Sequence, residues 1–130
     1  MQSRTAFIAV ISGLMSFPAA AAYADSAAQI ATAAQQAGLA ANAPDLRQAR
    51  TYLHQVMNCL VGPRDGDFDK AVPNPCAQQG NGAYADATNP DVKVKLQTAM
   101  SLVADGIAAS DEATAKKNAA DAQSQLAGLK

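Results

Sequence analysis

The sequence is poor in the residues from which most active sites and nucleic-acid interfaces are built. It has no tryptophan, one histidine, two cysteines and three tyrosines in 130 residues, and its formal net charge is −1. Proteins that bind nucleic acids neutralise phosphates with clustered Lys and Arg, and many stack bases on aromatic rings. The near-neutral charge and the scarcity of aromatic residues exclude that class.

The single histidine, His54, leaves little room for acid–base or nucleophilic catalysis. A hydrolytic triad needs a base beside a nucleophile, and no motif in the sequence pairs His54 with one. The carboxylates fall mostly in the first turns of predicted helices or in one loop, where helix capping and solvation account for them. The sequence has no phosphate-binding glycine motif and no C-x-x-C-H site for haem attachment. We therefore expect a protein that is not an enzyme and has no cofactor.

The first 24 residues have the three parts of a secretory signal peptide. Arg4 supplies the positive charge, residues 6–17 are mostly apolar, and Ala22-Tyr23-Ala24 has the small-residue pattern that a signal peptidase cleaves. We expect cleavage between Ala24 and Asp25, with a cut after Ala22 as the alternative. The apolar stretch is about half of the roughly 20 residues that span a bilayer. These features predict export to the periplasm or the medium without a permanent membrane anchor.

Residues 25–130 are rich in alanine and poor in large apolar side chains. Alanine supplies 25 of these 106 residues, and it has the highest intrinsic helix propensity. A chain of this length forms one domain. We therefore expect a single helical domain whose thin core benefits from a covalent cross-link.

Four segments repeat apolar residues at helical spacing: 26–41, 44–61, 90–109 and 110–127. In the second, Pro44 fits the first helical position, and Gly62-Pro63 provides a cap and a stop. In the third, Asn89 is the predicted cap before Pro90. In the fourth, Ser110 is the predicted cap.

The large apolar residues concentrate in the second and third segments. We expect these two helices to form a central antiparallel hairpin, with the alanine-faced helices on its flanks. The predicted fold is an all-α, up-and-down four-helix bundle. The alternative is the same hairpin with a loosely attached first helix.

A connection of 28 residues, 62–89, joins the two central segments. Loops of this length are uncommon in compact domains and are usually functional or disordered. Its glycines, prolines and Asn-Gly sequence favour turns, so we expect no regular helix in it.

The two cysteines, Cys59 and Cys76, lie at the end of the second predicted helix and in the middle of this connection. Two thiols in an exported protein normally pair. A redox-active or metal-binding pair is the alternative, but the sequence has no C-x-x-C motif. We expect a structural disulfide that folds the loop back on the helix.

His54 and Met57 are the candidate metal ligands. Their i,i+3 spacing places them on one helix face, and imidazole and thioether groups suit copper. The simpler interpretation is a half-buried histidine hydrogen-bonded to the backbone of the loop. The alternating Asp65, Asp67 and Asp69 resemble the start of a calcium-binding loop. However, Lys70 and Cys76 occupy the places that such a loop reserves for Gly and Glu, so we expect a solvated acidic turn.

One block resembles a known family. The block comprises Leu53-His54-Gln55-Val56-Met57-Asn58-Cys59-Leu60-Val61-Gly62-Pro63, then Phe68-Asp69, Asn74-Pro75-Cys76 and Gly80-Asn81-Gly82. It is similar to a family of small exported helical proteins of proteobacteria, over roughly residues 30–90. The resemblance implies an exported helical protein but no particular activity. Family members carry further histidines near the positions of Gln36, Tyr52 and Gln55. Only His54 matches here, which weakens any metal role that the resemblance implies.

Together these features predict an exported, non-catalytic helical protein that binds a ligand or partner or serves a structural role. A protein partner and self-association are both compatible with the sequence. The alternative is a periplasmic copper-type binding protein that uses His54 and Met57.

Overall fold

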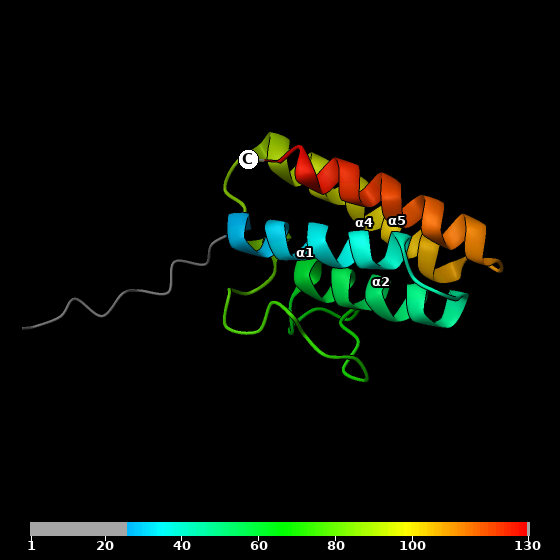
Figure 1. Cartoon of the computed structure of the whole chain (residues 1–130). Helices are drawn as coiled ribbons and strands as arrows, with labels where there is room; N and C mark the ends of the chain where they lie inside the picture. Colours follow the sequence, from blue (N-terminus) through cyan, green and yellow to red (C-terminus); the bar gives the residue numbers. More distant parts are fainter. Residues whose placement is uncertain (1–25, 130) are drawn as a thin grey trace, which may run out of the picture.

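The computed structural model describes residues 26–129, which form helices and no β-strand. The helices are α1 (Ser26–Ala41), α2 (Leu46–Val61), α3 (Ala83–Asp86), α4 (Pro90–Ala108) and α5 (Glu112–Ala127). The four long helices run alternately in opposite directions (Figure 1), which confirms the predicted all-α up-and-down bundle. The expected signal peptide and its cleavage site at Ala24 and Asp25 lie outside the described residues.

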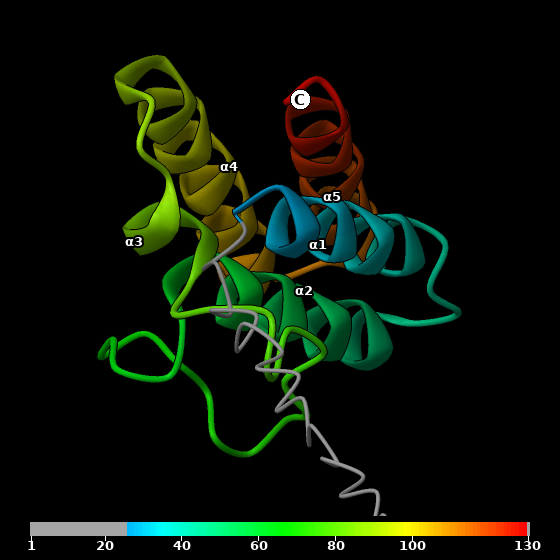
Figure 2. The same cartoon turned by 90° about the vertical axis from the view of Figure 1, so that its left-hand side faces the viewer.

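Each long helix has two antiparallel neighbours. Helix α1 packs against α2 and α5, and α4 packs against α5 and α2. Figure 2 shows the α4/α5 pair inclined to the α1/α2 pair. Helices α2 and α4 are antiparallel, as expected of a hairpin, but the alanine-faced helices pack on each other as well as on this pair. The first helix is therefore an integral part of the bundle and is not loosely attached.

The core combines a few large side chains with many methyl groups. The fully buried large aliphatic side chains come mainly from α2 and α4, and α1 and α5 contribute fully buried alanines: Leu53, Val56, Leu60, Leu96, Val103 and Leu126; Ala33, Ala37, Ala40, Ala115, Ala119 and Ala122. Because a buried methylene contributes only about 0.8 kcal/mol, each alanine contact is small. The small side chains let helix backbones approach closely, and this close packing stabilises the bundle.

Aspartates begin two of the helices, and the predicted boundaries there were wrong. The Asp45 side chain accepts a hydrogen bond from the Gln48 amide at 2.7 Å, so α2 begins after Asp45 and Pro44 precedes the cap. Likewise Asp111, not Ser110, caps α5. In both cases the carboxylate satisfies a free amide three residues along the chain. The predicted cap Asn89 of α4 is confirmed.

The prediction that residues 62–89 contain no regular helix was also wrong, because Ala83–Asp86 form the single turn α3. The Asp86 amide donates to the Gly82 carbonyl at 3.0 Å, and the Ala87 amide donates to the Ala83 carbonyl at 3.0 Å. This turn follows the last glycine of the loop, and α1 holds it in place through Asp86.

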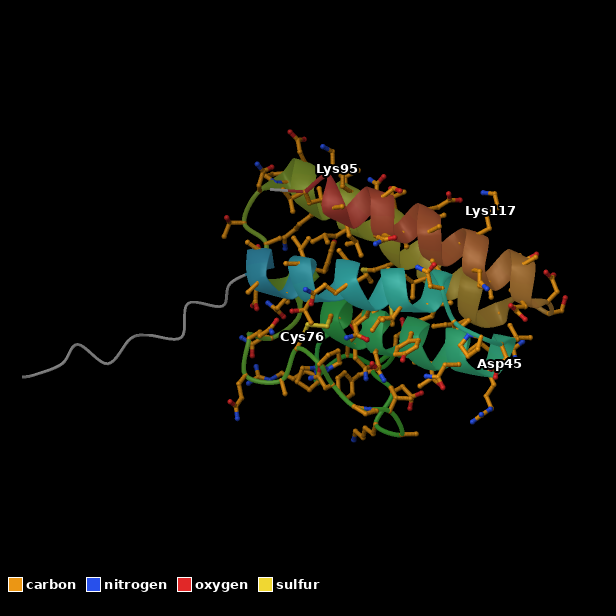
Figure 3. All side chains as sticks on the ribbon, viewed as in Figure 1. Asp45, Cys76, Lys95 and Lys117 are labelled. Atoms are coloured by element: carbon orange, nitrogen blue, oxygen red, sulfur yellow. A yellow bond between two sulfur atoms is a disulfide. The ribbon has the colours of Figure 1, made fainter. Side chains whose placement is uncertain are left out.

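Two basic side chains brace the two short connections, α1–α2 and α4–α5, at the end of the bundle opposite to α3. Arg50 of α2 donates to the Ala109 carbonyl, where α4 ends. Lys116 of α5 donates to the Ala43 carbonyl at 3.0 Å, in the α1–α2 turn. These contacts hold the two short connections together at that end. Lys95 and Lys117 point away from the bundle (Figure 3).

Candidate functional site

The long loop begins and ends at one point. Gly62 ends α2 with φ +80°, and Gly82 precedes α3 with φ +111°. A Cβ on Gly62 would collide with the Asn81 carbonyl oxygen, and one on Gly82 would collide with the Val61 carbonyl oxygen. Both positions therefore require glycine. Residues 62–82 form a compact loop with touching ends, longer than but similar to an Ω-loop, on the α2 side of the bundle (Figure 1).

The predicted disulfide between Cys59 and Cys76 is confirmed. The two Cα atoms are 5.2 Å apart, and both residues are buried. Figure 3 shows the bond beside the labelled Cys76. The Cys76 sulfur also lies 3.7 Å from the Gln29 carbonyl oxygen of α1. The bond therefore anchors the middle of the loop to α2 and against α1.

Asn58 fixes the first arm of the loop, which is the part between α2 and Cys76. Its side chain, in a residue only 1% exposed, donates to the Asp69 carbonyl at 2.9 Å and accepts from the Asp69 amide at 2.8 Å. Both backbone hydrogen-bonding groups of Asp69 are thus held by one buried amide. Asp69 therefore has a defined position over α2.

His54 lies against the residue that Asn58 holds. Its Nδ1 atom is 3.2 Å from Asp69 Oδ2, and the two side chains are 34% and 28% exposed. The other carboxylate oxygen accepts from the Ala71 amide at 2.8 Å. The expected partner, the backbone of the loop, was therefore wrong, because a loop carboxylate takes its place. This contact places the Nδ1 edge of the imidazole against the loop.

His54 and Met57 line one small cavity of about 240 Å³, together with Asp67 of the loop and Ala104 and Ile107 of α4. The structure thus brings the two predicted metal ligands to one place. Among residues 26–129, no group of three His, Cys, Asp or Glu side chains lies close enough to hold a metal ion. A metal in this cavity would therefore depend on the Met57 sulfur.

The alternating aspartates brace turns. Asp65 accepts from the Asp67 amide at 2.9 Å, and Asp69 accepts from an amide two residues along in the same way. Such side-chain-to-backbone bonds are typical of Asx turns. Asp65 and Asp67 are exposed, as expected of a solvated acidic turn.

Gln29 of α1 fixes the second arm of the loop, which is the part between Cys76 and α3. The sequence did not identify Gln29 as a functional residue. The residue is 1% exposed. Its side chain accepts from the Gly82 amide and donates to Asp86 Oδ2, both at 2.8 Å. The same carboxylate oxygen accepts from the Asn81 amide at 2.7 Å. No local pattern distinguishes Gln29 from the exposed Gln35, since only the position of the distant loop makes Gln29 important.

No protein-family model matches the chain, and no curated protein or solved structure is significantly similar to it. None of the helices in residues 26–129 is long and apolar enough to cross a membrane.

Proposed function

We propose that the chain is an exported, non-catalytic binding protein and that the cavity beside His54 is its binding site. The observation that carries the proposal is the chain of contacts from Asn58 to Asp69 to His54. A buried amide fixes a backbone segment, whose carboxylate orients a partly exposed imidazole. Such preorganisation lowers the entropic cost of binding.

The lining of the cavity indicates what it accepts. His54 and Asp67 offer polar atoms, and Met57, Ala104 and Ile107 offer apolar surface. The volume of about 240 Å³ is below the roughly 300–1,000 Å³ of sites for drug-sized ligands. The cavity therefore fits a group of a few heavy atoms with an apolar body and a hydrogen-bonding tip, such as one side chain of a partner protein.

Nuclear magnetic resonance can test this assignment with phenol and butylamine, which mimic the Tyr and Lys side chains. We expect at least one probe to shift the resonances of Met57 and Ile107 in a saturable way. His54→Ala should weaken the response, and Gln55→Ala, a change at the neighbouring helix position, should leave it intact. If neither probe shifts these resonances, or if both variants respond alike, the assignment is wrong.

Export is the second part of the proposal. It is supported by the signal-like residues 1–24 and by a buried disulfide, a bond that persists in oxidising compartments. The intact mass of protein recovered from outside the cytoplasm should correspond to an oxidised chain that begins at Asp25. Recovery of the full-length chain in the membrane fraction would refute this part.

Transition-metal binding is a second candidate function, favoured by the carboxylate on His54. Histidines that ligate metals commonly have a carboxylate beside their other ring nitrogen, and Asp69 Oδ2 lies 3.2 Å from His54 Nδ1. Copper should then bind 1:1 in calorimetry, and His54→Ala or Met57→Leu should abolish the site. Met100→Leu, a change outside this cavity, is the matched control. If the parent protein binds no copper, this candidate is wrong.

A further inference from the structure

The second arm of the loop contains a reactive dipeptide, Asn81-Gly82. The backbone nitrogen of the glycine can attack Asn81 Cγ, because glycine has no side chain that hinders the approach. Ammonia leaves and a five-membered succinimide forms. Water then opens the ring to aspartate or isoaspartate, so the balance is amide plus water giving carboxylate plus ammonia. The reaction needs no enzyme and no reactant other than water.

The folded loop opposes the first step of this reaction. The attacking nitrogen belongs to a buried residue, and its N–H donates to Gln29 Oε1 at 2.8 Å. A succinimide nitrogen carries no hydrogen, so cyclisation removes this bond to a side chain in the interior. On the other side of the dipeptide, the Asn81 amide donates to Asp86 Oδ2 at 2.7 Å. Two hydrogen bonds therefore hold the dipeptide against rearrangement.

The folded loop also disfavours the products. Isoaspartate inserts a methylene into the backbone beside Gly82, where the two arms already touch. Asn81 lines a cavity of about 430 Å³ with Arg64, Asp65 and Asp86. Conversion of Asn81 to aspartate would add a carboxylate to those of Asp65 and Asp86, beside Arg64. Repulsion between like charges then opposes closure of the loop.

We propose that Asn81 is a masked modification site. It is unreactive while the loop is closed, it converts to a carboxylate once the loop opens, and the conversion is one-way. Reduction of the Cys59–Cys76 disulfide by a dithiol, which is itself oxidised to a disulfide, yields two thiols and opens the loop. The fraction of chains with a converted Asn81 therefore increases with the time that the loop has spent open.

A matched reference can be built into the same molecule. Asp65→Asn creates a second Asn-Gly pair in the first arm, where no atom lies within 4 Å of a Cβ placed on Gly66. The oxidised variant is incubated at neutral pH, and both sites are followed by peptide mass spectrometry. We expect position 65 to convert at least about tenfold faster than Asn81, as for a site that reacts only through local opening. In concentrated urea the two rates should converge.

Removal of the contacts that hold the loop closed should accelerate the reaction at Asn81. Gln29→Ala, or reduction of the disulfide in the parent protein, should raise the rate at Asn81 toward its rate in urea. Gln35→Ala, at an exposed position of the same helix, should not change it. The reduced parent provides the test even if the Gln29 variant fails to fold. Conversion of Asn81 in the oxidised native protein at its rate in urea would overturn the proposal, as would no acceleration on reduction.

Discussion

At the scale of single residues, buried amide side chains hold the loop. Asn58 makes two hydrogen bonds to the backbone of Asp69, and its replacement leaves both groups of Asp69 without these partners. Removal of such partners costs about 1–3 kcal/mol, so Asn58→Leu should lower the free energy of unfolding by about that amount. Chemical denaturation monitored by circular dichroism measures the change.

The exposed Asn42 is the matched control for Asn58. Its side chain donates to the Gly38 carbonyl one turn earlier, and surface changes of this kind are usually within about 0.5 kcal/mol. Asn42→Ala should therefore have a small effect. Equal losses of stability in the two variants would show that Asn58 is not a clamp.

At the scale of helices, the Asp111 cap at the start of α5 makes the stability of the protein depend on pH. Hydrogen bonds from the Thr114 backbone amide and then from its hydroxyl hold the pKa of Asp111 below its ordinary value of 3.8. A lowered pKa in the folded state means that the cap stabilises the protein above pH 3.8 and that this contribution is lost as the pH falls through the folded pKa.

Asp111→Ala should therefore lower the melting temperature at neutral pH and have less effect in acid. Asp111→Asn should retain a cap at neutral pH but lack this acid dependence. Thermal melts across the acid range measure both effects. A deficit of Asp111→Ala that stays constant down to strongly acidic pH would contradict this assignment.

Two glycines inside helices should respond in opposite ways to alanine. A Cβ on Gly106 of α4 would lie 2.8 Å from Leu53 Cδ1 and 3.4 Å from the Ala115 carbonyl of α5. The atoms nearest to a Cβ on Gly38 of α1 belong to the flexible side chain of Gln123. Alanine in a helix is favoured over glycine by about 1 kcal/mol. We expect melting experiments to show Gly38→Ala neutral or stabilising and Gly106→Ala destabilising. Equal melting temperatures of the two variants would show that the close approach at Gly106 is unimportant.

The helices were predictable because their signals are local. Apolar spacing and the cap at Asn89 act within a few residues, and α1 has the predicted bounds. The disulfide was predictable because the chain has only two cysteines. The contacts of Gln29 and the partner of His54 were not, since they join α1 and α2 to loop residues whose positions no local pattern specifies. The clamp at Asn58 and the turn α3 depend on the same docking of the loop.

At the scale of the whole molecule, the disulfide holds the loop on the bundle and adds to the stability of the fold. It joins residues 17 positions apart, and closing such a loop contributes roughly 3 kcal/mol in the chain-entropy model. Cys59→Ala with Cys76→Ala should keep most of the helical circular dichroism and melt roughly 10–20 °C below the parent. Protease should then cut within residues 62–89. An unchanged melting temperature and an uncut loop would show that the bond has no structural role.

The meeting of the loop ends at Gly62 and Gly82 has a consequence for how such a protein can diversify. Helix α2 ends and α3 begins at nearly the same point, so the length of the path between them does not set how far apart these two helices lie. Insertions and exchanges are best tolerated where the two ends of a segment are close. The exposed residues 63–67 can therefore change in length and sequence, and acquire a new specificity, while Asp69 and Cys76 keep their contacts with α2 and the four long helices remain as they are.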